Sequence, residues 1–132
     1  ITSAITKLSR VSSIPSNHLV YRGMHSRKLP EAFRSPDQYG IRGGVEYGML
    51  STTTERRVAL QYSTKGGKGK GPKVSYLFEI QVGAIDRGAS LRFLSQYQQE
   101  EEFTFSPLSN LEVVGSWRAE QTAGKQLVIV VP

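Results

Sequence analysis

Residues 95–107 read SQYQQEEEFTFSP, a polar stretch that brings three consecutive carboxylates to an alternating aromatic segment. Side chains in a strand alternate between its two faces, so we expect Glu100 and Glu102 to share a face and Glu101 to point away. Two ionised carboxylates on one face repel each other, and the arrangement adds little to stability. The stretch therefore indicates either a solvated acidic turn before an edge strand or a catalytic pair.

The length and composition of the chain indicate a single globular domain. It has 132 residues, of which 38% are apolar, with 13 Gly and 6 Pro, enough for one core but not two. We expect residues 1–132 to be one domain cut from a longer protein, since the N-terminus has neither Met nor a signal-peptide pattern. No apolar run approaches the roughly 18–20 residues of a membrane span, and no membrane partner is expected.

Metal and thiol chemistry have no support in the sequence. The chain has no Cys, which excludes disulfides, thiolate catalysis and Cys-ligated zinc. His18 and His25 are its two imidazoles, too few for a histidine metal cluster. We predict no metal site.

The net charge of +6 is concentrated partly in residues 65–73, which read KGGKGKGPK. A basic excess attracts polyanions, so this segment is either a solvated loop or, together with Arg42, a nucleic-acid-binding surface. It lacks the residue order of a phosphate-binding loop, and no aromatic residues are interleaved with its lysines as stacking platforms. These features argue against nucleic acid as a partner.

Periodicity predicts many short strands and few helices. We expect a helix within residues 1–17 and a helical turn at 29–33. A second helix is expected at 55–63, with Thr53 or Thr54 as its N-cap. The predicted strands cover residues 18–24, 45–53, 74–82, 89–94, 102–106, 111–117 and 126–131. This pattern is typical of a sandwich-like α+β domain.

Two further positions suggest a binding site. Arg22 follows a short apolar strand, where a buried guanidinium needs an anion, either a structural carboxylate or a phosphate. Gly23 would let a ligand approach the backbone. On the helix at 55–63, Tyr62 belongs either to the core or to the wall of a pocket.

Three motifs now stand in order along the chain: Tyr21-Arg22-Gly23, Ser51-Thr52-Thr53 and Glu100-x-Glu102. This order resembles the arginine–serine–glutamate branch of the mono-ADP-ribosyltransferases, over about residues 18–115. The flanking positions agree with the family pattern: Ser95, Tyr97, Phe103, Phe105 and Pro107, with Tyr62 on the helix after the serine motif. The resemblance implies two packed, roughly perpendicular, antiparallel-rich β-sheets with a few short helices, and NAD in the cleft between the sheets.

The resemblance also implies a role for each residue toward NAD. Glu102 would stabilise the positive charge that develops on the ribose, and Ser51 would hold Glu102 in position. Arg22 would bind the phosphates, and the Gly23 backbone the nicotinamide amide. Thr52 would line the pocket, and Tyr62 would stack on the nicotinamide ring.

The acceptor is implied by Glu100. Members of the family with Glu at this position modify arginine, whose guanidinium needs a nearby base, and Tyr97 would touch the acceptor protein. The expected partner is thus a target protein bearing an acceptor arginine. Two alternatives stay open: an NAD glycohydrolase using the same site, and a non-catalytic basic module that binds nucleic acid or protein.

The chain departs from the family pattern in two places. Thr53 stands where the motif usually has a final Ser, and residues 1–17 provide only a helical stub where relatives have several helices, which bears on NAD affinity. The lack of cysteine separates the chain from disulfide-bonded cell-surface members. It favours an intracellular setting or action in a host cytosol.

Overall fold

The computed structural model describes residues 1–14, 18–25, 28–64, 74–83, 87–123 and 127–132. The lysine-rich segment 65–73 lies outside the described residues. The helical elements are α1 (Thr2–Val11), α2 (Arg56–Thr64) and the 3₁₀ turns η1 (Glu31–Phe33) and η2 (Gln98–Glu100). The strands are β1 (Leu19–His25), β2 (Gly43–Glu46), β3 (Leu50–Thr53), β4 (Ser75–Gln81), β5 (Ala89–Ser90), β6 (Glu102–Phe105), β7 (Ser109–Glu112), β8 (Arg118–Gln121) and β9 (Leu127–Val131).

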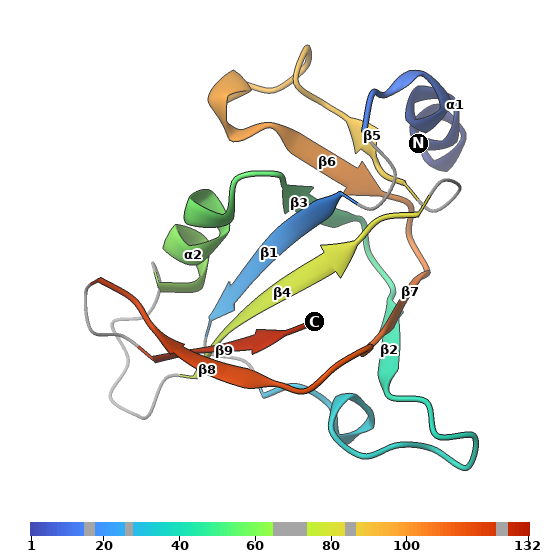
Figure 1. Ribbon diagram of the computed structural model, residues 1–132. Helices are drawn as coiled ribbons and strands as arrows, with labels where there is room; N and C mark the ends of the chain where they lie inside the picture. Colours follow the sequence, from blue (N-terminus) through green and yellow to red (C-terminus); the bar gives the residue numbers. More distant parts are fainter. Residues whose placement is uncertain (15–17, 26–27, 65–73, 84–86, 124–126) are drawn as a thin grey trace.

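The strands form a seven-stranded sheet, in the order β5-β6-β3-β1-β4-β9-β8, and a two-stranded sheet of β2 and β7 (Figure 1). β1 and β4 form the centre of the large sheet and pair antiparallel along their full length, from Leu19 opposite Gln81 to His25 opposite Ser75. Only β4 and β9 run parallel among the pairs that the structure describes. The predicted α+β class with two antiparallel-rich sheets is confirmed.

One face of the large sheet is covered by α2. Ala59 of this helix is buried against Leu77, Val128 and Val130 of β4 and β9. The helix also lies so close to β1 that a Cβ placed on Gly23 would be 1.8 Å from the Ala59 carbonyl oxygen. Gly23 is therefore required by the packing of α2.

The opposite face packs against η1 and the small sheet. Phe33 of η1 stacks on Phe78 of β4 with ring centroids 5.8 Å apart, and Tyr76, Val113 and Val131 belong to the same buried cluster. Burying these large apolar side chains is the main stabilising contribution on this face. Leu111 of β7 packs against the same cluster, so the small sheet is held against β4.

Several predicted strand boundaries are wrong. The single strand expected at 45–53 is two strands, β2 and β3, which belong to different sheets and are separated by a turn at residues 47–49. The strand expected at 89–94 is only the two residues of β5. The segment expected at 111–117 begins earlier as β7 and ends at Glu112, and β8 was not predicted.

Candidate active site

A cavity of about 700 Å³ opens between β1, β3, α2 and the entry to β6. Its volume lies within the roughly 300–1,000 Å³ typical of small-molecule sites. The structure brings all eight residues predicted for the site to its lining: Arg22, Gly23, Ser51, Thr52, Tyr62, Tyr97, Glu100 and Glu102. Residues that sequence reasoning did not assign to it also line it, among them Glu46, Met49 and His25.

Glu100 and Glu102 reach this cavity in a different way from the one predicted. Glu100 is the last residue of η2, and Glu102 is the first residue of β6. Between them Glu101 has a left-handed backbone, φ 43°, which few non-glycine residues adopt. The prediction that Glu100 and Glu102 share one face of a strand is wrong. The chain reverses direction at Glu101, and this reversal brings the carboxylates of Glu100 and Glu102 to the lining of the same cavity.

Side-chain contacts hold the reversal at Glu101. The Thr54 hydroxyl donates to one carboxylate oxygen of Glu101 at 2.8 Å, and Arg92 lies 3.5 Å from the other. The Thr53 hydroxyl donates to the Glu100 carbonyl oxygen and accepts from the Glu55 backbone at the start of α2. The Glu101 carboxylate thus points away from the cavity, as predicted, and fixes the turn that carries Glu100.

Tyr62 faces Glu100 across the cavity. Its hydroxyl lies 3.2 Å from both carboxylate oxygens of Glu100 and donates to that group. Burial raises the pKa of Tyr62, and the negative charge of Glu100 raises it further. The phenol is therefore a persistent hydrogen-bond donor to Glu100, while half of the tyrosine side chain stays exposed.

Arg22 has a carboxylate partner, Glu46. Arg22 Nη2 lies 3.6 Å from Glu46 Oε2, and the pair joins β1 of the large sheet to β2 of the small one. The sequence indicated that this arginine needs an anion but did not identify Glu46. The one sequence feature that could have pointed to Glu46 is its position just before the turn that leads to Ser51.

The hydroxyl motif on β3 has several separate contacts. Thr52 donates to the Phe103 carbonyl oxygen at 2.9 Å and so ties β3 to β6. Ser51 is exposed at the cavity and lies opposite Thr104 in the strand register, two residues beyond Glu102. Within the described ranges no hydrogen bond joins Ser51 to Glu102, and the positioning role of Ser51 stays a prediction.

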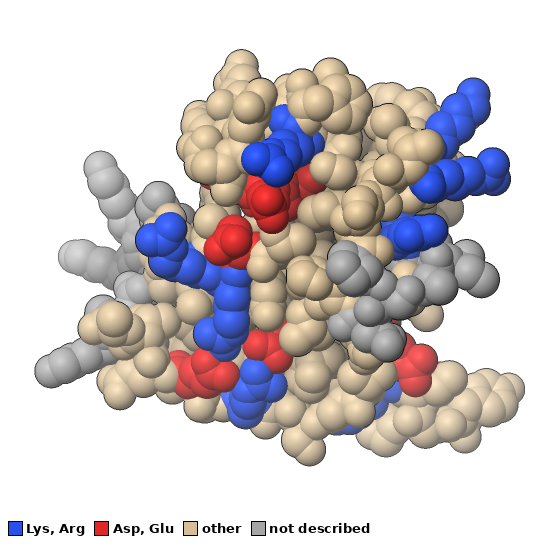
Figure 2. Space-filling model, turned by 45° about the horizontal axis from the view of Figure 1, so that its top comes forward, with Lys and Arg blue, Asp and Glu red and all other residues tan. Residues whose placement is uncertain are grey.

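One face of the molecule carries a mixed group of acidic and basic side chains (Figure 2). Figure 2 shows acidic side chains gathered near the middle of one face, with basic side chains bordering them.

Among the described residues, no group of three or more His, Asp or Glu side chains is arranged to hold a metal ion. In the same part of the chain, no helix is long and apolar enough to cross a membrane.

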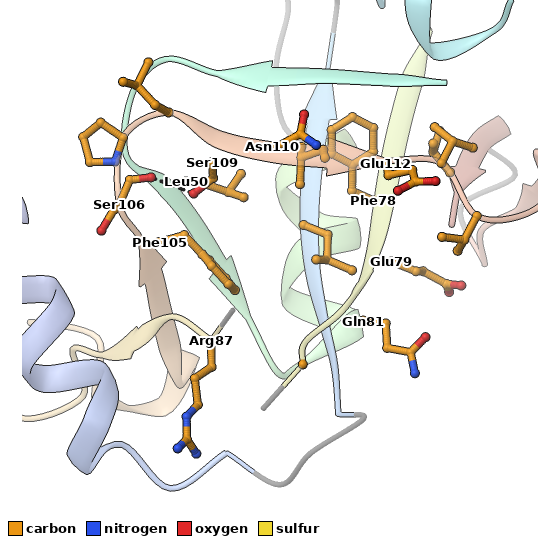
Figure 3. A pocket seen from close by; sticks show the side chains of 18 of the residues that line it. Leu50, Phe78, Glu79, Gln81, Arg87, Phe105, Ser106, Ser109, Asn110 and Glu112 are labelled. Atoms are coloured by element: carbon orange, nitrogen blue, oxygen red, sulfur yellow. Dashed lines mark hydrogen bonds between the residues drawn. The ribbon is translucent and has the colours of Figure 1, made fainter. Parts of the chain in front are cut away.

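A second cavity, of about 720 Å³, lies between α1, β4 and β7 (Figure 3). Phe78 and Phe105 project toward it, and Glu79, Gln81 and Arg87 lie around it. It contains none of the residues predicted for the site. We assign the candidate chemistry to the first cavity because the carboxylates and the arginine of the three motifs line that one.

Comparison with known proteins finds similar solved structures but no match to a family model or to a curated sequence. No protein-family model matches the chain, and no curated protein matches it in sequence. The Vis ADP-ribosyltransferase of Vibrio splendidus in complex with the M6 inhibitor is 24% identical, with a TM-score of 0.56 over 87% of this chain and 47% of that one. Its complex with agmatine gives 23% identity and a TM-score of 0.55 over 87% and 48% of the two chains.

A second ADP-ribosyltransferase, HopU1 of Pseudomonas syringae, superimposes with a TM-score of 0.58 over 99% of this chain and 50% of its own, at 20% identity. The chain thus has the ADP-ribosyltransferase fold. It spans about half the length of these solved structures.

Proposed function

We propose that this chain is a mono-ADP-ribosyltransferase of the arginine–serine–glutamate branch that moves ADP-ribose from NAD to an arginine side chain of a target protein and releases nicotinamide. The observation that carries the proposal is that Arg22, Ser51 and Glu102, from three different strands, line one cavity. The fold shared with Vis and HopU1 supports it.

The cavity is suited to NAD in its charge and walls. Arg22 is the one Lys or Arg side chain among the described lining residues, and a guanidinium matches phosphate oxygens bidentately. Tyr62 offers a half-exposed aromatic ring for the nicotinamide, and the Gly23 backbone lies at the same lining. NAD supplies a glycosidic bond whose cleavage leaves positive charge on the sugar.

The carboxylates have separate tasks in this proposal. Glu102, fixed at the start of β6, faces the charge that develops on the sugar and stabilises it, with Ser51 beside it. Glu100 accepts a proton from the acceptor guanidinium, which is otherwise charged and a poor nucleophile. Tyr97, 56% exposed next to Glu100, contacts the acceptor protein.

An assay with NAD and agmatine, a small guanidine acceptor, tests these roles. We expect Glu102→Gln to lose both transfer and NAD cleavage, by at least about 100-fold. Glu100→Gln should lose about 100-fold or more in transfer to agmatine but retain part of its NAD cleavage, because only the acceptor base is removed. Products are followed as free nicotinamide and as ADP-ribosyl-agmatine by mass spectrometry.

The matched control is Glu112→Gln, an exposed carboxylate on β7 outside the cavity, which should behave as the native protein. Equal activity of the native protein and the three variants would contradict the roles proposed for Glu100 and Glu102.

Hydrolysis of NAD is the second candidate, because the acceptor side of the cavity is open to solvent. Tyr62 and Tyr97 are 51% and 56% exposed there, so water has access to the position of the acceptor. Nicotinamide release that stays unchanged when agmatine is added, with no agmatine adduct, would establish a glycohydrolase. A basic nucleic-acid module has less support, since Arg42 donates to the Gly115 carbonyl oxygen at 2.8 Å.

A further inference from the structure

Arg22 and Glu46, which form an ion pair, both line the cavity of the proposed NAD site. The two side chains are about a quarter and a third exposed, so solvent screens them only in part. Their 3.6 Å separation is longer than the roughly 2.7–2.9 Å of a charge-assisted hydrogen bond between such groups. Glu46 is thus a loosely bound partner for the cation that the proposed function assigns to the phosphates.

The turn after β2 holds Glu46 in this place. The Gly48 backbone N–H donates to Glu46 Oε1 at 3.2 Å, which leaves Oε2 directed at Arg22. A backbone contact within the turn thus helps to hold the carboxylate at the cavity. Its position is set by the backbone of the turn and does not depend on Arg22 alone.

The balance of charge in the cavity determines how strongly Glu46 competes with an entering anion for Arg22. The described lining residues include three carboxylates, Glu46, Glu100 and Glu102, and a single guanidinium, that of Arg22. An anion that enters must compete with Glu46 for Arg22 and is repelled by all three carboxylates. A phosphate that binds Arg22 bidentately gains two charge-assisted hydrogen bonds in place of the longer contact with Glu46.

We propose that Glu46 is a resident counter-ion of Arg22 that a ligand must displace, and that it thereby lowers the affinity of the site for phosphate-bearing nucleotides. The inference rests on the proposed function, because it takes the nucleotide phosphates to bind at Arg22. It adds a residue that determines ligand affinity and that none of the three motifs contains. Glu46 sets affinity for the nucleotide and takes no part in cleavage.

Calorimetric titration with ADP-ribose and with AMP tests the proposal without any catalytic turnover. Glu46→Gln removes the charge but keeps an oxygen that accepts from Gly48. We expect it to bind ADP-ribose roughly five-fold more tightly than the native protein, the scale of a partly exposed ion pair. AMP should also bind more tightly to this variant, because its phosphate competes with Glu46 for the same guanidinium. Glu112→Gln, with the same change in net charge, should match the native protein.

The outcomes separate the two proposals. Unchanged or weaker ADP-ribose binding by a folded Glu46→Gln protein would overturn the counter-ion role and leave the proposed function standing. No ADP-ribose binding by either protein would overturn both. Glu46→Ala, checked by circular dichroism, replaces the Gln variant if that one does not fold, and the same increase in affinity is expected.

Discussion

At the scale of single residues, the site depends on contacts that join neighbouring carboxylates to different partners. Glu100 accepts from Tyr62, Glu101 pairs with Thr54 and Arg92, and Glu102 is left facing the cavity. Three consecutive glutamates therefore have three different surroundings. Because their contacts differ, the three carboxylates can have different roles in the site.

Tyr62 should ionise at a higher pH than an ordinary tyrosine. Its pKa is raised above the usual 10.0 by burial and by the Glu100 charge, so its contribution to stability is present below pH 10.0 and is lost as the pH rises through the folded-state value. Ultraviolet titration of tyrosinate in the native protein and in Tyr62→Phe isolates this group by difference. We expect a midpoint above 10.0.

Glu100→Gln provides the control for that titration. Removing the carboxylate charge should move the Tyr62 midpoint down but not back to 10.0, since burial is the larger cause. An unchanged Tyr62 midpoint in Glu100→Gln would show that the hydroxyl does not face Glu100.

At the scale of elements, Gly23 controls how closely α2 lies on β1. We expect Gly23→Ala to destabilise the protein by about 1–3 kcal/mol, because the added Cβ meets the Ala59 carbonyl oxygen and the Ser63 backbone, which have little freedom to move. Gly83→Ala is the matched control, since a Cβ there meets nothing within 4 Å. Urea unfolding measures the stability of the two variants. Equal unfolding midpoints for Gly23→Ala and Gly83→Ala would contradict the close packing of α2 on β1.

The sequence predicted the elements that carry the site better than it predicted their boundaries. β1, β4, β6, β9 and both helices lie close to where periodicity places them. β2 and β3 were merged because the alternation of residues 45–53 continues across the turn, although Gly48 marked it. Phe93 and Leu94 extended β5 in the prediction because exposed apolar residues in a turn resemble a strand.

The site itself was predicted from motifs, and its geometry was not. Strand alternation gave the correct direction for Glu101 but for the wrong reason, since a left-handed turn residue cannot be inferred from three glutamates. The ion pair of Arg22 with Glu46 was missed because it joins two sheets whose relative position no local pattern reveals.

At the scale of the whole molecule, four charged side chains join α2 to two strands of the large sheet. Arg56 of α2 and Arg118 of β8 both pair with Glu79 of β4 and with Glu120 of β8. Shared partners make such a network more stabilising than separate surface pairs. It holds the start of α2 to the β8 edge of the sheet.

This network should weaken in acid. Hydrogen bonds from Arg56 and then Arg118 lower the pKa of Glu120 below 4.5, so its stabilising contribution is present above pH 4.5 and is lost as the pH falls through the folded-state value. Thermal melts between about pH 7 and pH 3 should show Glu120→Gln less stable at neutral pH, with the difference from the native protein vanishing in acid. Glu55→Gln, at an exposed carboxylate of the same region, makes the same change in charge outside the network and is the matched control.

The position of β9 has a consequence for biosynthesis. This strand, residues 127–131, lies inside the large sheet between β4 and β8, and among the strands that the structure describes β8 pairs with β9 alone. In the growing chain, the side of β4 that pairs with β9 therefore has no partner until residues 127–131 have been synthesised. That unpaired β4 edge is where a chaperone would be needed.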